Sequence, residues 1–108
     1  MITAADFTAR LTDLLNQMRK DKEFPSVHYC YRSKEEQNRL FKEGLSKCDG
    51  YQRLSNHQRM RAADVYLSDG KGKIFWEWDE KKARYYHKKW EGYGGKEMIE
   101  WDRGHYEI

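Results

Sequence analysis

The sequence predicts an α+β domain, in which a small antiparallel β-sheet has helices packed on one side. Segments with helical spacing of apolar residues and segments with strict alternation both occur along the chain. Two alternating segments flank a glycine-containing turn at residues 68–72, which is typical of antiparallel neighbours. The length of 108 residues suits one domain, residues 1–108. We therefore expect one layer of strands covered by helices.

The first predicted helix covers residues 4–19, and a strand follows over residues 26–32. Thr3 and Asp6 are placed as a capping pair at the start of the helix. The strand comes after the only proline, Pro25, and has Arg32 at its end. The helical stripe is Phe7, Leu11, Leu14, Leu15 and Met18, and the strand alternates Val27, Tyr29 and Tyr31 against His28, Cys30 and Arg32.

A capping box at residues 33–36 predicts a second helix that ends near Gly44. Its apolar residues Leu40, Phe41 and Leu45 are expected to form a buried stripe. Residues 46–56 are predicted as a loop with a turn at Asp49-Gly50.

Two neighbouring strands are predicted over residues 61–67 and 73–78. Alternation in the first places Ala62, Asp64 and Tyr66 on one face and Ala63, Val65 and Leu67 on the other.

Asp79 is the predicted N-cap of a third helix, which ends at the glycines of residues 92–95. Its buried face is expected to carry Ala83, Tyr86, His87 and Trp90, with Tyr85 beside them, and its lysines face solvent. A last strand over residues 103–108 would present His105 and Glu107 on one face.

The composition predicts an aromatic-rich core. Charged residues make up 36% of the chain, yet it contains 4 Trp, 8 Tyr and 4 Phe. A domain with so small a core often needs an additional source of stability, such as a bound metal ion. Cys30 and Cys48 lack the C-x-x-C spacing of a metal or redox site, so we expect buried, reduced thiols. The net charge of +3 is too small to choose among anionic partners.

Two stretches offer the groups of a zinc hydrolase, namely two imidazoles and two carboxylates. His57 precedes Asp64 by seven residues, and Asp102 precedes His105 by three. A catalytic zinc takes three such ligands and leaves one position for water. Asp64 lies in an apolar strand, where a carboxylate needs a cation, and the small Ala62 would leave room for a metal.

Other readings of these residues remain open. Asp64 could pair with Arg61, and Asp102 could orient a ligand instead of acting as a base. Glu107 could support the site or belong to a strand surface. Three further residues are assigned ordinary structural roles, namely His28, His87 and Ser55.

Three motifs together resemble the peptidoglycan peptidases of the D-alanyl-D-alanine carboxypeptidase type, which include D,D-dipeptidases and small phage endolysins. The likeness spans residues 31–108, with one departure at Met60, where the family usually has glycine. The motifs are Ser55-x-His57 followed by Ala62-x-Asp64, the ending Asp102-x-x-His105-x-Glu107, and the upstream run Tyr31-Arg32-Ser33-x-Glu35-Glu36-Gln37-x-x-Leu40-Phe41-x-x-Gly44.

The resemblance implies a Hedgehog-like or D,D-peptidase-like fold and zinc-dependent hydrolysis of a peptide bond in peptidoglycan. His57, Asp64 and His105 would be the zinc ligands, Asp102 the general base and Arg32 a cation that faces the substrate. Endopeptidase, carboxypeptidase and dipeptidase action all remain open. The partner would be a peptidoglycan stem peptide, bound by a monomer without nucleic acid or stable membrane insertion.

The N-terminus shows no secretory signal, so we expect synthesis in the cytoplasm and action on the cell wall after release through a holin-type pore. Two alternatives from other classes are a catalytically silent zinc module and a basic, aromatic nucleic-acid binder.

Overall fold

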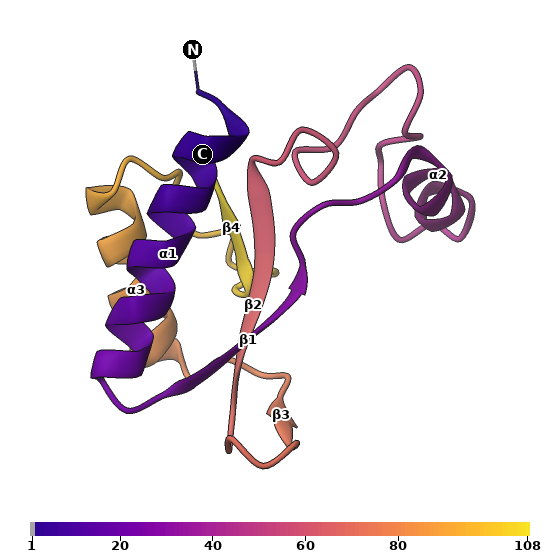
Figure 1. The fold of residues 1–108 in the computed structure, drawn as a ribbon. Coiled ribbons are helices and arrows are strands. Elements are labelled where there is room, and N and C mark those ends of the chain that lie inside the picture. Colours follow the sequence, from indigo (N-terminus) through magenta and orange to yellow (C-terminus); the bar gives the residue numbers. More distant parts are fainter. Residues whose placement is uncertain (1) are drawn as a thin grey trace.

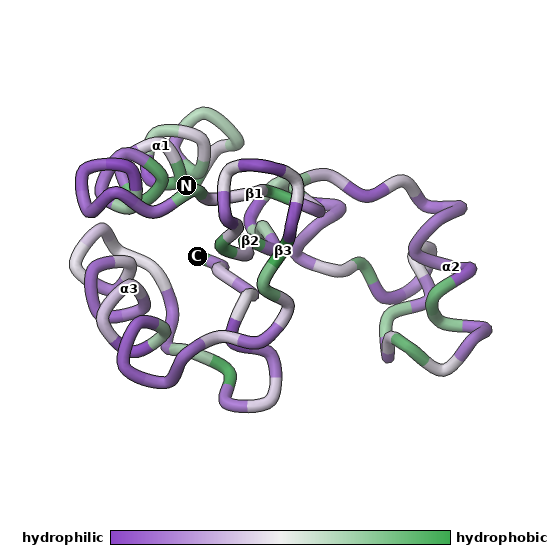
Figure 2. The backbone as a smooth tube through the Cα atoms, turned by 90° about the horizontal axis from the view of Figure 1, so that it is seen from below, coloured by the Kyte–Doolittle hydropathy of each residue, from purple (hydrophilic) through white to green (hydrophobic). Residues whose placement is uncertain are grey.

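The computed structural model describes residues 2–108 and confirms the α+β class with an antiparallel sheet (Figure 1). Helices α1 and α3 lie together on one side of the sheet, and α2 stands apart on its other side (Figures 1 and 2). Within the described range, no helix is both long and apolar enough to cross a membrane. The elements in chain order are α1 (Ala4–Lys20), β1 (Phe24–Tyr29), α2 (Lys34–Lys42), β2 (Ala62–Ser68), β3 (Ile74–Phe75), α3 (Glu80–Gly92) and β4 (His105–Glu107).

Strand β2 is the centre of the sheet, and all of its neighbours are antiparallel to it. β1 pairs along one edge of β2. On the other edge, β4 pairs with the start of β2 and β3 with its end. The register places His105 directly opposite Asp64, so two of the predicted ligands become cross-strand neighbours on one face.

The core lies between the sheet and the pair α1 and α3, and it is aromatic-rich as predicted. Trp90 and Tyr106 are fully buried, and the indole nitrogens of Trp90 and Trp78 donate to the carbonyls of Glu107 and Val65. Each buried indole N–H therefore has an acceptor, whereas the buried hydroxyl of Tyr106 has no hydrogen-bond partner among the described residues. The largest fully buried side chains also include Phe7, Leu14, Met18 and Val65.

The predicted N-cap residues are present, but the capping box predicted at residues 33–36 is only half formed, because the Glu36 carboxylate binds Tyr29 and Arg39 instead. Thr3 and Asp6 form a reciprocal capping box on α1. The side chains of Ser33 and Asp79 accept the backbone N–H of Glu36 and Lys82 at the starts of α2 and α3. Each bond pairs an N–H that the first helical turn leaves without a partner.

A β-bulge changes the predicted alternation of β1, which also ends at Tyr29 and not at Arg32. Val27 pairs with Val65 and Tyr29 with Asp64, so His28 is an extra residue between them. The extra residue places Tyr29 on the face of Asp64, whereas regular alternation would have kept it with Val27. The ring of His28 contacts that of Tyr66, so the bulge adds a second aromatic side chain to this face.

Strand β3 is shorter than predicted because Trp76 and Trp78 lie in different environments. A regular strand would place residues 76 and 78 on the same face. Trp78 is buried in the core, but Trp76 is 62% exposed and contacts Tyr66. The chain must therefore leave the strand after Phe75.

The predicted buried stripe of α2 is wrong. Phe41 is 44% exposed and Leu45 is 71% exposed, whereas Gln37 is fully buried. The amide of Gln37 donates to Ser46 Oγ at 2.7 Å and to the carbonyl of Cys48 at 2.8 Å. Polar anchoring therefore holds α2 against its own loop and leaves apolar side chains outside.

Candidate metal centre

The three predicted ligands, His57, Asp64 and His105, lie together beside the start of β2. One ligand atom from each falls within 4.8 Å of the others, the one such group of His, Cys, Asp or Glu side chains in residues 2–108. The Asp64 and His105 side chains meet through the pairing of β2 with β4. His57 arrives on the turn before β2, where Ser55 Oγ accepts the N–H of Gln58, in agreement with the structural role predicted for this serine.

The spacing of these atoms suits a tetrahedral zinc. Asp64 Oδ1 lies 3.5 Å from His57 Nε2 and 3.3 Å from His105 Nδ1. Zinc bonds of about 2.0–2.1 Å in a tetrahedron separate ligand atoms by about 3.3–3.4 Å. The residues therefore fit a metal ion in kind, and the two separations from Asp64 fit zinc in spacing, so the structure supports the prediction of a metal site here.

The electrostatics of the group favour a cation. Burial alone would raise the pKa of Asp64, but the hydrogen bonds and charges of His105 and His57 outweigh burial and hold that pKa well below its usual range. Burial likewise would lower the pKa of His105, but its contact with Asp64 raises it instead. The centre thus keeps a charged carboxylate that is compensated by positive charge.

The position of Glu107 behind His105 favours a supporting role for this carboxylate over a place on the strand surface. Glu107 Oε1 lies 3.8 Å from His105 Nε2, the nitrogen that points away from Asp64. Asn56 donates to the other oxygen of Glu107. Carboxylates placed behind a ligand histidine fix its ring orientation. The sequence alone did not indicate Asn56, because its partner is 51 residues away.

Arg32, and not Arg61, is the cation beside Asp64. Its Nη2 lies 3.7 Å from Asp64 Oδ2, the oxygen not shared with the histidines, and its side chain is only 10% exposed. Nη1 donates to Gln37 Oε1 at 2.9 Å, and the guanidinium lies 4.4 Å from the centroid of the Tyr29 ring. Arg61 instead donates to the carbonyl of Ile2. The predicted alternative of an Asp64–Arg61 pair is therefore wrong.

Asp102 reaches the same cavity from the turn before β4. The backbone N–H of His105 donates to the carbonyl of Asp102 at 3.0 Å, which closes the turn, and both residues line the cavity. Burial and the nearby charge of Asp64 raise the pKa of Asp102. A carboxylate with a raised pKa beside a metal site suits a group that accepts and returns protons.

These residues share a cavity of about 550 Å³. The three metal-ligand residues form part of its lining, together with Arg32 and Asp102. The α2 region contributes Leu40 and Leu45, and the turn before β4 contributes Trp101, which is 86% exposed. A cavity of this size lies in the range of sites that bind small-molecule ligands.

Met60 adopts the left-handed conformation, with φ of 55°. Glycine adopts this conformation without a steric penalty, whereas other residues are strained there by about 1–2 kcal/mol. The departure noted in the sequence therefore falls at a position whose backbone favours glycine. The turn nevertheless closes, because the N–H of Arg61 donates to the carbonyl of Asn56 at 2.9 Å.

Gly104 permits the turn that carries Asp102 to pack on β2. A Cβ at this position would lie 2.9 Å from Tyr66 Cζ and 3.0 Å from the carbonyl oxygen of Val65. We expect Gly104→Ala to lower the free energy of unfolding by about 1–3 kcal/mol, as overpacking does. Denaturant unfolding measures the change. Gly92→Ala is the matched control, since a Cβ there meets open space, and equal stability of the two variants would contradict the packing argument.

The other histidines and the cysteines lie outside the centre. His87 is buried, with Nε2 2.6 Å from the carbonyl oxygen of Arg103 and its ring stacked on Tyr106. His28 is exposed on β1. Cys30 and Cys48 are free thiols, both partly buried.

Neither the comparison of the chain with protein-family models nor that with curated proteins gives a match. The likeness to peptidoglycan peptidases thus rests on the spacing of the motif residues.

Proposed function

We propose that the chain is a zinc-dependent peptidase that hydrolyses a peptide bond in peptidoglycan stem peptides. The observation that carries the proposal is the clustering of three potential ligand atoms within 4.8 Å of one another, in a cavity that Asp102 also lines. A structural zinc usually has four protein ligands and no open position, whereas a catalytic zinc has three. The half-buried Asp102 beside a three-ligand site therefore favours catalysis.

Each residue has a role that its contacts suggest. Zinc, when bound by His57, Asp64 and His105, would supply a water of lowered pKa and polarise the scissile carbonyl. Asp102 accepts the proton of the attacking water and returns it to the leaving amine. Arg32 holds the outer oxygen of Asp64.

Arg32 lines the metal cavity and has one N–H group that is not yet hydrogen-bonded. Its Nε is buried and has no hydrogen-bond partner among the described residues. An unpaired N–H on a cation is a strong donor for a carboxylate or a developing oxyanion. This agrees with the substrate-facing role that the family resemblance implies.

Arg32→Lys tests this role. Lysine keeps the charge but cannot contact Asp64, Gln37 and a substrate oxygen at once, because it lacks the planar fork. We expect kcat/KM to fall by about 10- to 100-fold, the loss of one hydrogen bond to a charged group, while zinc content at saturating metal stays at one per chain. Kinetics on a defined muropeptide measure kcat/KM, and metal analysis measures the zinc content. Unchanged kinetics would show that Arg32 does not contact the substrate.

Digestion of purified cell wall tests the proposed function itself. Zinc-loaded protein should release peptides with new amino and carboxyl termini, and mass spectrometry of the products identifies the bond. Endopeptidase, carboxypeptidase and dipeptidase action each release different products, so the masses distinguish them. Zinc binding without any released peptide would instead support the silent zinc module.

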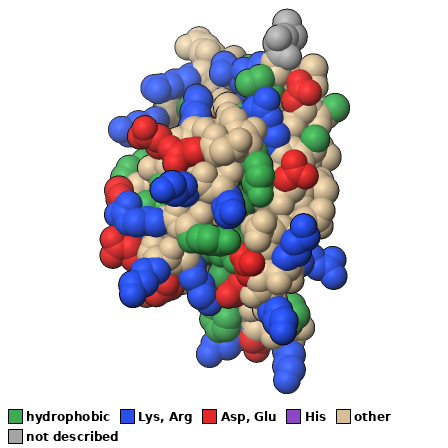
Figure 3. All heavy atoms as spheres, turned by 90° about the vertical axis from the view of Figure 1, so that its left-hand side faces the viewer, with side chains coloured by type: hydrophobic (Ala, Val, Ile, Leu, Met, Phe, Trp, Pro, Cys, Tyr) green, Lys and Arg blue, Asp and Glu red, His purple; other side chains and the backbone are tan. Residues whose placement is uncertain are grey.

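The nucleic-acid alternative receives no support from the charge distribution. Lys82 pairs with Glu23, and Arg84 pairs with Glu80 and Glu100. Figure 3 shows basic and acidic side chains interleaved over the face formed by α1 and α3, without a continuous basic surface there. Phosphate binding depends on unpaired positive charge.

The predicted place of Tyr85 in the core is wrong, because its side chain is 45% exposed. The ammonium group of Lys89 lies over its ring.

A further inference from the structure

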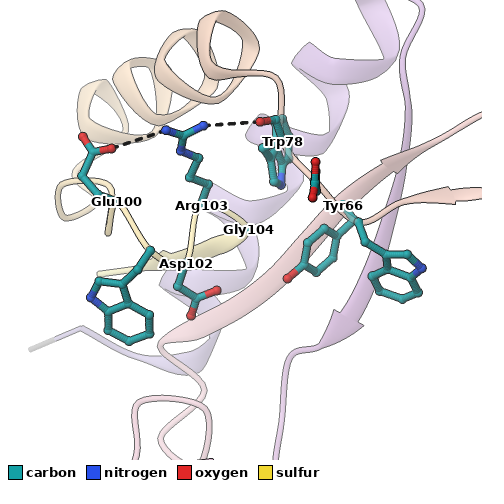
Figure 4. Close-up of a pocket in the computed structure, with 9 residues that line it drawn as sticks. Tyr66, Trp78, Glu100, Asp102, Arg103 and Gly104 are labelled. Carbon is teal, nitrogen blue, oxygen red and sulfur yellow. Dashed lines mark hydrogen bonds and ion pairs between the residues drawn. The ribbon is translucent and has the colours of Figure 1, made fainter.

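A second cavity, of about 290 Å³, adjoins the candidate metal centre. Trp101 and Asp102 line both cavities, so a ligand in one is next to a ligand in the other. In Figure 4, the carboxylate of Asp102 and the ring of Tyr66 face one another across this second cavity. The roles proposed above leave its lining, Asp102 apart, without a function.

The lining combines exposed aromatic rings that are held in place. Trp76 is 62% exposed, yet its ring centroid lies 4.9 Å from that of His28 and 5.3 Å from that of Tyr66. The β-bulge in β1 supplies His28 to this cluster. An indole fixed by its neighbours and open to solvent is a ready platform, since little side-chain freedom is lost when a ligand stacks on it.

The polar groups of the lining exclude anions. Glu77, Glu100 and Asp102 contribute carboxylates. Arg103, the basic residue of the lining, is already engaged, with Nη2 3.7 Å from Glu100 and Nη1 donating to the carbonyl of Trp78. A phosphate or carboxylate would therefore meet net negative charge. An uncharged ligand with an apolar face and several hydroxyl groups matches both the rings and the carboxylates, and a cation is the alternative that the kinetic test below separates from it.

We propose that this cavity binds a sugar ring of the peptidoglycan glycan strand while the attached peptide lies in the metal cavity. The C–H groups on one face of a pyranose pack against the negative face of an indole, and its hydroxyls donate to carboxylates. The inference rests on the proposed function, because it assigns the substrate a sugar next to the peptide that is cleaved. The continuity of the two cavities at Asp102 supports one substrate spanning both.

Binding of a disaccharide of N-acetylglucosamine and N-acetylmuramic acid tests the cavity without any need for hydrolysis, provided that the lactyl carboxyl of the muramic acid is capped as a simple amide. The cap keeps the probe uncharged, as the sugar is where the stem peptide is attached. We expect the zinc-loaded protein to bind it, with chemical shift changes at the indole N–H of Trp76, and Trp76→Ala to weaken binding by about 10-fold or more. Phe75→Ala is the matched control, because Phe75 is a neighbouring aromatic residue, 43% exposed, that does not line the cavity. Equal affinity of both variants, or no binding by the wild type, would overturn the proposal.

Kinetics connect the cavity to catalysis. We expect the wild type to hydrolyse a disaccharide-bearing peptide with a kcat/KM about 10-fold above that for the same peptide without sugar, and Trp76→Ala to remove the difference while it still hydrolyses the free peptide. Disaccharide binding without hydrolysis of either substrate would uphold the sugar site and reject the peptidase. Binding of a lysine peptide at this cavity in place of the disaccharide would assign it to a cation and reject the sugar.

Discussion

Asp102→Asn is expected to lower peptidoglycan hydrolysis by about 10²- to 10⁴-fold, the loss typical of a missing general base. Asparagine keeps the shape and packing of the side chain but cannot accept a proton. One zinc per chain should remain bound, because Asp102 is not among the three clustered ligands. Release of soluble muropeptides and metal analysis on the same sample measure the two quantities.

A neutralised carboxylate outside the cavity provides the control for Asp102. Glu97→Gln changes an exposed residue between α3 and β4 and should leave turnover unchanged. If Asp102 only orients a ligand, Asp102→Asn should instead weaken zinc affinity by about 10- to 100-fold. If neither quantity changes, the base lies elsewhere and Glu107 is the next residue to test.

Removal of zinc is expected to lower the thermal midpoint by about 15–30 °C. At free zinc of about 1,000 times Kd, binding stabilises the folded state by about 4 kcal/mol, and for a domain of this size each kcal/mol shifts Tm by about 4–8 °C. The metal also compensates the charge of Asp64, which lies largely buried with His57 and His105. Calorimetry with and without a chelator measures the shift.

Histidine variants separate a metal effect from a general effect of the chelator. The His57→Ala, His105→Ala double variant should bind no zinc and should not respond to chelator. His28→Ala removes an exposed imidazole outside the centre and should behave as the wild type. Full zinc retention in the double variant would contradict the assignment of the ligands.

Local patterns predicted that His57, Asp64 and His105 would meet, because each lies where alternation or a turn fixes the direction of its side chain. Asp64 and His105 follow strand alternation, and the register of β2 and β4 then brings them together. The buried face of α3 could also be predicted from the sequence. Its residues Ala83, Tyr86, His87 and Trp90 repeat at helical spacing, and all four are buried. In these segments the local pattern and the tertiary packing require the same arrangement.

The remaining features depend on contacts that no local pattern contains. The bulge at His28 appears only once β1 pairs with β2, because alternation cannot reveal an inserted residue. Leu40, Phe41 and Leu45 have helical spacing, but the core that would cover them is occupied by α1 and α3 on the other side of the sheet (Figure 1). The engagement of Arg32 with Asp64 likewise joins residues 32 positions apart in the chain.

The most direct test of the proposed peptidase is mass spectrometry of muropeptides after purified cell wall is incubated with the zinc-loaded protein, the metal-free protein and Asp102→Asn. The account predicts new peptide termini with the zinc-loaded wild type, almost none with the other two samples, and restored cleavage when zinc is returned to the metal-free protein. Cell wall that stays intact with a protein carrying one zinc per chain would contradict it.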